Sequence, residues 1–507
     1  MTLLCVAIFV TDLAQARRDI RLAANAGADL VELRIDTFTE PDPLRQLVHD
    51  CLLPAIVTCR AIWEGGRCTL PDADRIKLLE SACGGRTHYL DIELEVARRG
   101  GDLPVGAPLI VSYHNFDAPP ARLHNIILEM NQRPGHVNKV AFMARSIRDN
   151  LMVFELLQQR QKPTIALCMG EAGLISRILA KKFGALLTFA SLEEHSATAS
   201  GQIPIHQFKN LYRWDKIGPD TRIYGVVASP VKHSMSPAIH NAAFDAVGHD
   251  GLYLPFLVEG TYESFKAFME EFVNFPGLNL SGLSITLPHK EHALRYLRDK
   301  NATIEPLAQT IGAVNTIVID SNNGAPTLRG YNTDYAAILD SITDCLKITR
   351  QQLAGKRIAI LGAGGTGRTA TAALAHYHAD VTVYNRTLDR AQSLAKEFGV
   401  TAAPLENLPA SHHEIYLNTT SIGMHPNTDP SPFGDTPPTL TPQTVVFDAV
   451  YNPPLTHLLQ QARLAGALTI SGVEMFVRQA ARQFELWTNE PAPIDLMRQV
   501  VLAKLMP

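Results

Sequence analysis

The chain has 507 residues, which is too many for one hydrophobic core, so its length predicts two to four domains. Hydrophobic residues make up 46% and charged residues 19% of the chain, as in an ordinary globular protein in water. A formal net charge of -4 leaves no basic excess to neutralise phosphates, which argues against a nucleic-acid-binding surface.

The cysteines and the apolar runs bear on the compartment. Seven cysteines are scattered without C-x-x-C spacing, so we expect reduced, mostly buried thiols rather than disulfides or a zinc site. No apolar run is long enough to span a bilayer. The opening MTLLCVAIFV lacks the basic flank and cleavage site of a signal peptide and is interpreted as a first strand. These features predict a cytoplasmic protein with no membrane contact.

Residues 3–190 alternate short β-rich runs with amphipathic segments. Eight such runs separated by helical patterns predict a (β/α)8 barrel, which we place at residues 1–205. The runs are LLCVAIF, DLVELRI, AIVTCR, HYLDIEL, LIVSYH, NKVAFMA, TIALCM and ALLTFA.

The predicted strand ends carry the polar residues that suggest chemistry, because barrel active sites lie at the carboxyl ends of the strands. Lys139 is the outlier, since it lies inside the apolar run NKVAFMA and a buried lysine is costly unless paired or neutral. An amine nucleophile near pH 7 needs a pKa roughly 3 units below the usual value of about 10.4, and we expect nearby arginines and the barrel interior to lower it. His114 is the candidate proton shuttle and Glu64 its orienting partner.

Five motifs in this half resemble, in order, those of type I 3-dehydroquinate dehydratase: VELRID (31–36), TCRAIWEGG (58–66), DIELE (91–95), SYHNF (112–116) and KVAFMA (139–144). The resemblance implies that Lys139 forms a Schiff base with a substrate ketone, that His114 transfers protons with support from Glu64, and that no metal takes part. It also implies a set of substrate-binding residues: Glu32, Arg34, Arg60, Arg177, Thr198 and Gln202.

Residues 206–221 interrupt this rhythm and are predicted to form a short ordered linker. A new α/β pattern then begins at Arg222. Ser234 and Ser236 precede a predicted helix and could be helix caps. Lys290 and Asp334 each follow a strand and begin a helix, so helix-terminus electrostatics would also explain them, with Asp334 as an N-cap.

The stretch from Arg357 to Arg390 predicts a dinucleotide site. Gly362, Gly364 and Gly367 match G-x-G-x-x-G between an apolar strand and a helix, where bare backbone can approach a pyrophosphate. The second strand ends in Asn385-Arg386-Thr387, with Arg390 one turn later. An NAD site would place an acidic residue there, whereas guanidinium groups suit the 2′-phosphate of NADP. A solvated basic helix start is the alternative.

The second half resembles shikimate dehydrogenase over about residues 222–500, through GLSITLPHKEHAL (282–294), GAVNTI (312–317), GYNTDYAAI (330–338), NTTSIGM (418–424) and DAVYNPP (448–454). The resemblance implies a catalytic pair, Lys290 and Asp334, beside a carbonyl reduced by NADPH. It implies a substrate domain at 222–340, completed by 474–507, and an NADP-binding Rossmann domain at 345–473. The implied substrate-binding residues are Ser234, Ser236, Thr286, Asn315, Tyr451 and Gln479, and the implied cofactor-binding residues are Gly362, Ala363, Gly364, Gly365, Thr366, Gly367, Asn385, Arg386, Thr387, Arg390, Asn418, Gly472 and Met475.

The two resemblances name consecutive reactions, from 3-dehydroquinate to 3-dehydroshikimate and on to shikimate. Together they imply a bifunctional enzyme of the shikimate pathway. Two alternatives stay open: a second half that acts on quinate, and a non-catalytic regulator built from the same domains. Either a monomer or a homodimer is compatible with the sequence.

Overall fold

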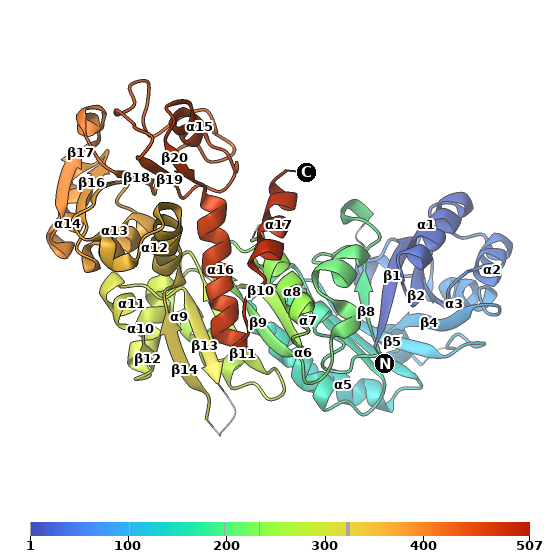
Figure 1. The fold of residues 1–507 in the computed structure, drawn as a ribbon. Helices are drawn as coiled ribbons and strands as arrows, with labels where there is room; N and C mark the ends of the chain where they lie inside the picture. Colours follow the sequence, from blue (N-terminus) through green and yellow to red (C-terminus); the bar gives the residue numbers. More distant parts are fainter. Residues whose placement is uncertain (1, 101, 197, 233, 321–324, 507) are drawn as a thin grey trace. The chain divides into compact units, whose positions relative to one another are not determined.

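The computed structural model describes residues 2–100, 102–196, 198–232, 234–320 and 325–506 (Figure 1). By its internal contacts the chain forms two compact units. The first unit comprises 1–224, 228–232 and 250–280, and the second comprises 225–227, 233–249 and 281–507.

The first unit is built on an eight-stranded sheet in the order β7-β6-β5-β4-β3-β2-β1-β8. Neighbouring strands in this order are parallel, and the ring is completed where the Leu186 amide donates to the Thr164 carbonyl at 2.8 Å. This arrangement confirms the predicted (β/α)8 barrel. The strands are β1 (Leu3–Phe9), β2 (Leu30–Arg34), β3 (Ala55–Thr58), β4 (Thr87–Glu93), β5 (Leu109–Asn115), β6 (Val137–Met143), β7 (Thr164–Met169) and β8 (Leu187–Ala190).

Helices alternate with these strands along the chain. They are α1 (Leu13–Asn25), α2 (Pro41–His49), α3 (Asp72–Ser81), α4 (Leu94–Arg98), α5 (Leu123–Gln132), α6 (Asp149–Gln158) and α7 (Leu174–Ile178). Alternate strand residues such as Ile110, Val137 and Ala141 belong to one buried cluster, because successive side chains of a strand point to opposite faces. Lys139 falls between Val137 and Ala141 in that row, so the strand period directs its side chain into the barrel.

Residues 206–221, predicted as a linker, are ordered and packed within the first unit. The rings of Phe208 and Trp214 meet edge to face with centroids 5.5 Å apart. The Lys181 ammonium donates to the Trp214 carbonyl at 3.0 Å, and the Lys182 ammonium donates to the Thr221 carbonyl at 2.8 Å. The segment is therefore fastened to the helical region after β7.

A second sheet has the strand order β10-β9-β11-β13-β14-β12. Strand β13 runs antiparallel to β11 and β14, so its first residues lie beside the last residues of those two strands. The elements are β9 (Arg222–Ala228), α8 (Ser236–Val247), β10 (Gly251–Leu257), α9 (Tyr262–Val273), β11 (Leu280–Ile285), α10 (Lys290–Asp299), β12 (Thr303–Ile304), α11 (Pro306–Ile311), β13 (Thr316–Asp320), β14 (Thr327–Tyr331) and α12 (Thr333–Leu346).

The third sheet is parallel, in the order β17-β16-β15-β18-β19-β20. Numbered from its first strand, this is the 3-2-1-4-5-6 order of a dinucleotide-binding fold, which confirms the predicted Rossmann domain. Its elements are β15 (Arg357–Leu361), α13 (Gly365–His376), β16 (Asp380–Asn385), α14 (Leu388–Phe398), β17 (Thr401–Pro404), β18 (Ile415–Asn418), β19 (Val445–Asp448), α15 (His457–Leu464) and β20 (Leu468–Ile470).

Helix α16 (Gly472–Thr488), followed by α17 (Ile494–Leu505), joins the Rossmann lobe to the other part of the second unit (Figure 1). Near its start, Met475 packs on the core shared by the Rossmann sheet and α12. Near its end, the Trp487 indole donates to the Ile317 carbonyl at 3.1 Å. The indole fits because Gly282 has no side chain, since a Cβ there would lie 2.3 Å from the indole nitrogen.

Among the described residues, no helix combines the length and the apolar composition that crossing a bilayer requires.

Candidate active sites

Lys139 is the centre of the polar end of the barrel. Its side chain is 5% exposed. The ammonium donates to Glu32 Oε1 on β2 at 3.0 Å and to Asp91 Oδ2 on β4 at 2.9 Å. It also lies 4.7 Å from the ring centroid of Phe189 on β8. Residues far apart in the sequence thus converge on one amine.

The expectation of a lowered Lys139 pKa is wrong for this arrangement. Burial acts to lower the pKa, but Asp91 and Glu32 outweigh it and raise the pKa above the usual value. The amine is therefore held as an ammonium ion, and it must give up a proton before it can attack a carbonyl. The sequence could not show this because the two carboxylates reach Lys139 only through the closure of the barrel.

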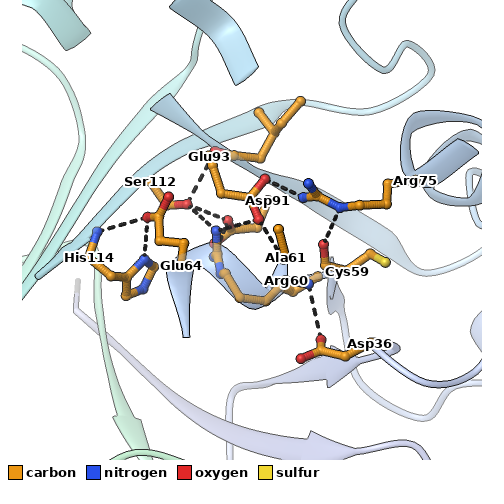
Figure 2. A network of polar contacts seen from close by, with 12 residues as sticks. Asp36, Cys59, Arg60, Ala61, Glu64, Arg75, Asp91, Glu93, Ser112 and His114 are labelled. Carbon is orange, nitrogen blue, oxygen red and sulfur yellow. Dashed lines mark hydrogen bonds and ion pairs between the residues drawn. The ribbon is translucent and has the colours of Figure 1, made fainter. Parts of the chain in front are cut away.

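Arg60 organises the carboxylates beside Lys139 (Figure 2). Its guanidinium donates to Asp91 Oδ1 at 2.5 Å and to Ser112 Oγ at 2.7 Å. Arg60 and Lys139 together hold the pKa of Asp91 below its usual range although burial acts in the opposite direction. Asp91 is consequently an anion shared by two cations.

His114 and Glu64 form a second pair at the same end (Figure 2). Glu64 Oε1 lies 2.9 Å from His114 Nδ1 and accepts the His114 backbone N–H at 2.8 Å. Burial, with Arg60 and Lys139, holds the pKa of His114 well below the usual value, so the imidazole is neutral. When Glu64 is ionised and accepts a hydrogen from Nδ1, Nε2 is left as the basic atom of His114. Burial raises the pKa of Glu64 to about 8.

One cavity brings together all nine residues predicted for this half. Within this cavity Arg177 is a buried guanidinium that lacks part of its hydrogen bonding. Its Nε has no hydrogen-bond partner among the described residues. Its Nη2 donates to the Ser200 carbonyl at 3.2 Å, and burial lowers its pKa to about 10. No carboxylate in the described part of the chain pairs with it. The residues lining the cavity are Glu32, Arg34, Arg60, Glu64, Gly65, His114, Phe116, Lys139, Ala141, Leu167, Met169, Arg177, Phe189, Thr198, Ala199 and Gln202.

The second unit contains a separate pair, Lys290 and Asp334. The Lys290 ammonium donates to Asp334 Oδ2 at 2.7 Å, and the two residues lie at the starts of α10 and α12. The alternative that Asp334 is an N-cap is wrong, because Asn332 is the cap and its side chain accepts from the Asp334 and Tyr335 amides. The Asp334 carboxylate is thereby free of a capping role and is available to Lys290.

Asn315 lies directly before β13 and contacts Thr333, the residue that precedes Asp334. Its Oδ1 accepts the Thr333 amide at 2.8 Å, its backbone amide donates to the Tyr331 carbonyl, and its carbonyl accepts the Ile285 amide at 2.7 Å. These contacts join the ends of β11 and β14 to Asn315. Thr286, the residue after β11, is therefore at the same edge as Asn315 and the Lys290–Asp334 pair.

Gln479 is brought to this edge by α16. Gln483, one turn later on the same face, accepts from Ser284 Oγ at 2.8 Å and donates to Thr316 Oγ1 at 3.0 Å. The Gln479 side chain donates to the Phe476 carbonyl at 3.0 Å, and the ring of Phe476 stacks on Tyr451 with centroids 5.0 Å apart.

Ser234 and Ser236 lie at the start of α8. Ser234 Oγ accepts the Ser236 amide at 3.3 Å, whereas the residue in the N-cap position, Met235, makes no side-chain cap. The contact within this turn places both serines together, and no described contact joins them to Lys290.

The glycine turn after β15 has the geometry that its motif predicts. Gly362 has a φ of 108°, which favours glycine. A Cβ on Gly367 would lie 2.2 Å from the Gly362 carbonyl oxygen, whereas Gly364 and Gly365 face open space. Ala363 and Thr366 belong to the same turn and the first turn of α13. The bare N-terminus of α13 is thus accessible to an anion.

Arg386 and Arg390 follow the end of β16, the second within the first turn of α14. Both side chains are exposed, and neither forms an ion pair with a described residue. Thr387, between them in the chain, supplies the carbonyl that accepts from Asn385 Nδ2 at 2.8 Å, so Asn385 fixes the turn that carries the arginines.

The other three predicted cofactor residues lie in the framework of the Rossmann lobe. Asn418 is fully buried and donates to Asp448 Oδ1 at 2.8 Å, which joins the ends of β18 and β19. A Cβ on Gly472 would lie 2.4 Å from the Val450 carbonyl oxygen, and Met475 packs on the lobe's core. These contacts position the loop after β19 beside the start of α16.

Some residues of the two sites were not predicted. Asp91 had a signal, because it lies in the DIELE motif at a strand end, yet its pairing with Lys139 depends on the fold. Gln483 contacts Ser284, which is 199 positions away, and nothing in the local sequence indicates this. No group of three His, Cys, Asp or Glu side chains in the described ranges is arranged to hold a metal.

Four family models match successive parts of the chain. Residues 4–219 match the family model for type I 3-dehydroquinase, and residues 226–317 match the substrate-binding domain of shikimate dehydrogenase. Residues 344–425 match shikimate/quinate 5-dehydrogenase, and residues 472–502 match the C-terminal domain of shikimate 5′-dehydrogenase.

Individual relatives cover the whole chain or its second half. The chain is 37% identical, over 99% of its own length and 84% of the relative's, to the bifunctional 3-dehydroquinate dehydratase/shikimate dehydrogenase, chloroplastic, of Arabidopsis thaliana. It is 40% identical over 56% of its length, and 99% of the relative's, to the shikimate dehydrogenase (NADP(+)) of Methanosarcina acetivorans. A solved shikimate dehydrogenase in complex with NADP+ matches 57% of this chain and 96% of its own, with a TM-score of 0.50 and 33% identity.

Proposed function

The chain belongs to the family of bifunctional 3-dehydroquinate dehydratase/shikimate dehydrogenases, and on this basis we propose how its residues divide the work. The barrel converts 3-dehydroquinate to 3-dehydroshikimate, and the second unit reduces that product to shikimate. The observation that supports the first assignment most directly is the cavity in which Lys139 lies with the Glu64–His114 pair.

Dehydration begins with imine formation at Lys139. The Nζ proton leaves, the amine attacks the substrate ketone, and loss of water gives an iminium ion. His114 Nε2 then removes a proton from the adjacent carbon, and the electron pair forms an enamine. The enamine expels the β-hydroxyl group as His114 returns the proton to it, so a second water is released. Hydrolysis of the imine restores Lys139 and frees the product.

Arg177 is proposed to bind the substrate carboxylate. A buried guanidinium without an anionic partner in the described chain is costly, and a carboxylate would supply two charge-assisted hydrogen bonds. Thr198 and Gln202 are joined by a hydrogen bond at 2.8 Å, and with Arg177 they line the same cavity.

Reduction takes place at the Lys290–Asp334 pair. Lys290 holds a proton on Nζ, 2.7 Å from Asp334, and can deliver it to the oxygen of the reduced carbonyl. Asp334 keeps the ammonium oriented. Asn315 and Thr286 at the adjacent strand ends, with Gln479, Ser234, Ser236 and Tyr451, are proposed to bind the ring hydroxyls and the carboxylate.

The dinucleotide is proposed to be NADP(H), which supplies the hydride when bound. The open backbone at Gly364 and Gly365 can accept a pyrophosphate at the start of α13. Arg386 and Arg390 are exposed without ion-pair partners among the described residues, and this favours a 2′-phosphate over a bare ribose.

Two other assignments compete with this one. Quinate differs from shikimate in its ring substituents, and the family model for residues 344–425 names both substrates. A regulator built from these domains would not need the Lys139–Asp91 and Lys290–Asp334 ion pairs. Both ion pairs lie within hydrogen-bonding distance, which supports catalysis.

The test uses one cuvette with the full-length protein, 3-dehydroquinate and NADPH, with nicotinamide absorbance as the signal. We expect oxidation of NADPH to begin from 3-dehydroquinate alone, and NADH to be a poor substitute. Lys139→Ala should abolish this signal, and added 3-dehydroshikimate should restore it. If 3-dehydroshikimate also gives no signal with the wild-type protein, the regulator becomes the better assignment. Quinate with NADP+ tests the other alternative.

Compartment and assembly belong to the same proposal. All seven cysteines are free, which supports a reducing compartment such as the cytoplasm, and cell fractionation would test it. The Arabidopsis relative is named as chloroplastic. Light scattering on the purified protein distinguishes the two proposed states, monomer and homodimer.

A further inference from the structure

Arg75 is a buried cation outside the dehydratase cavity. It extends from α3 and is only 2% exposed. Its Nε donates to the Cys59 carbonyl at 3.1 Å, and its Nη2 forms an ion pair with Glu93 (Figure 2). On the outer side, Nη1 donates to Asp72 at 2.9 Å. A buried charge of this kind is costly, and the cost is recovered only if every donor is paired.

Glu93, at the end of β4, is the partner of Arg75 and is fully buried. Its Oε1 accepts the Ala61 amide at 3.0 Å and lies 3.3 Å from Arg60 Nη1. Arg75 and Glu93 therefore contact three consecutive residues, Cys59, Arg60 and Ala61. These residues lead directly into the short turn Ile62–Glu64 that presents the His114 partner.

The turn has little freedom to move independently of Arg60. Cys68 donates its amide to the Arg60 carbonyl at 3.1 Å, and the Ile62 amide donates to the Cys68 carbonyl at 3.1 Å. Gly66 passes so close that a Cβ there would lie 2.0 Å from the Arg60 carbonyl oxygen. A displacement of residues 59–61 is thus transmitted to Glu64.

We propose that Arg75 and Glu93 are a positioning pair for the dehydratase reaction, which fixes residues 59–61 and thereby holds Glu64 against His114. Neither residue lines the cavity, so the pair acts through Arg60 and Glu64 rather than on the substrate. The proposal rests on the roles proposed for Glu64 and His114.

The Arg75–Glu93 pair also affects the pKa of Glu64, which a pair with only a structural role would not do. The charged and titratable groups facing Glu64 are Arg60 from its own loop, Asp91 and Glu93 from β4, and His114 from β5. The negative charge of Glu93 raises the pKa of Glu64, and Arg75 neutralises that charge. Removing Glu93 and removing Arg75 should consequently shift the ionisation of Glu64 in opposite directions.

The experiment measures dehydration of 3-dehydroquinate against pH for full-length Glu93→Gln, Arg75→Gln and Arg75→Lys. We expect kcat to fall about 10- to 100-fold in the Gln variants, the range for a displaced catalytic group, with a smaller change in KM. The pH at which activity rises should decrease in Glu93→Gln and increase in Arg75→Gln. Arg75→Lys keeps the charge but not the fork of donors, so its kcat should fall while its pH profile stays near that of the wild type.

Asp72→Asn is the matched control. Asp72 contacts Arg75 on the outer side, and within the described part of the chain no hydrogen bond or ion pair joins it to residues 59–64, so the kcat and pH profile of the variant should match the wild type. Trapping of the Lys139 imine with borohydride reports whether the barrel is folded and the amine is reactive, and reduction of added 3-dehydroshikimate reports on the second unit.

The outcomes separate this proposal from the assignment of the site. Unchanged kcat in Glu93→Gln and Arg75→Gln, or shifts of both profiles in the same direction, would overturn the positioning role. Loss of imine trapping together with dehydration would assign the pair to folding of the barrel and would also overturn it. If Glu64→Gln has no effect on dehydration, the proposed role of Glu64 fails instead.

Discussion

At the scale of single residues, the burial of Glu64 predicts how dehydration depends on pH. Its pKa of about 8 means that the carboxyl is mostly protonated at neutral pH, whereas the carboxylate is the form that accepts the Nδ1 hydrogen of His114 and stabilises an imidazolium ion. We expect kcat/KM for dehydration to rise as the pH increases through about 8. Glu64→Gln should lower kcat and remove this rise, and a rise that persists in the variant would assign it to another group.

The same side chain affects stability in the opposite sense. The folded state binds the Glu64 proton more tightly than the unfolded chain, where the pKa is about 4.3. Its contribution to the free energy of unfolding is therefore complete below about pH 4 and is lost as the pH rises towards 8. Denaturant unfolding followed by a barrel-specific probe should show a weaker loss of stability over this window in Glu64→Gln than in the wild type.

Arg386 and Arg390 predict the cofactor preference. Replacing both with serine removes two cations from the end of β16 without disturbing a described ion pair. We expect KM for NADPH to rise by about 100-fold or more, since charge-assisted hydrogen bonds to a phosphate contribute roughly 1.5–3 kcal/mol each and the double variant loses two of them, while KM for NADH changes little. Reduction of 3-dehydroshikimate with each nucleotide measures this. An equal loss with both nucleotides would place the arginines away from the 2′ position.

Single residues also show where sequence reasoning ends. That Lys139 is an unusual buried lysine follows from its strand alone. The direction of its pKa does not, because Glu32 and Asp91 come from two other strands and outweigh burial. Arg75 gave no local signal, since an arginine on an amphipathic helix is usually solvated.

At the scale of elements, the start of α12 is set by Asn332. Its Oδ1 accepts from the Asp334 and Tyr335 amides, and its Nδ2 donates to the Ala313 carbonyl at 3.0 Å. Asn332→Ala should lower the stability of the second unit by about 1 kcal/mol, the usual contribution of an N-cap. It should also lower kcat for reduction, because Asp334 lies in the first turn. Thermal unfolding and reductase assays test this.

The matched variant is Asn332→Ser, which keeps a neutral capping acceptor and loses the bond to Ala313. It should retain most of the stability. If Asn332→Ala is as stable and as active as the wild type, the capping bonds contribute nothing to the Lys290–Asp334 geometry.

Elements were more predictable than their contacts. The eight barrel runs agree with the observed strands to within one or two residues, because each is an apolar run bounded by turn residues. The capping assignment at Asp334 failed because two residues, Asn332 and Asp334, were each suited to the position. Only the backbone geometry of the turn decides which one accepts the amides.

At the scale of the whole molecule, the two reactions belong to different units, so inactive variants should complement each other. A mixture of Lys139→Ala and Lys290→Met should convert 3-dehydroquinate to shikimate with NADPH, although neither variant does so alone. The intermediate must diffuse between molecules, and we therefore expect a lag that shortens as protein concentration rises. Failure of the mixture would contradict the division of labour. A wild-type lag equal to that of the mixture would argue against channelling.

The fold class and the bifunctional organisation were predictable because each half has ordered motifs in the right structural context. The path of the chain at the junction was less predictable. The composition of residues 206–221 predicted a linker outside the barrel. In the structure their aromatic side chains are buried, and their carbonyls accept from Lys181 and Lys182. Long-range contacts of this kind depend on packing that no local window contains.

The contacts of α16 have a consequence for the order in which the protein takes shape during translation. All eight strands of the barrel lie within residues 3–190, so the barrel can fold while the rest of the chain is still being made. Strands β11 and β13 must wait much longer, because Gln483 and Trp487 are made more than 160 residues after their partners Thr316 and Ile317. Until then the Trp487 indole, which packs against Gly282 in the folded protein, has not been made. Truncation before residue 483, which removes both side chains, should therefore harm reduction far more than dehydration.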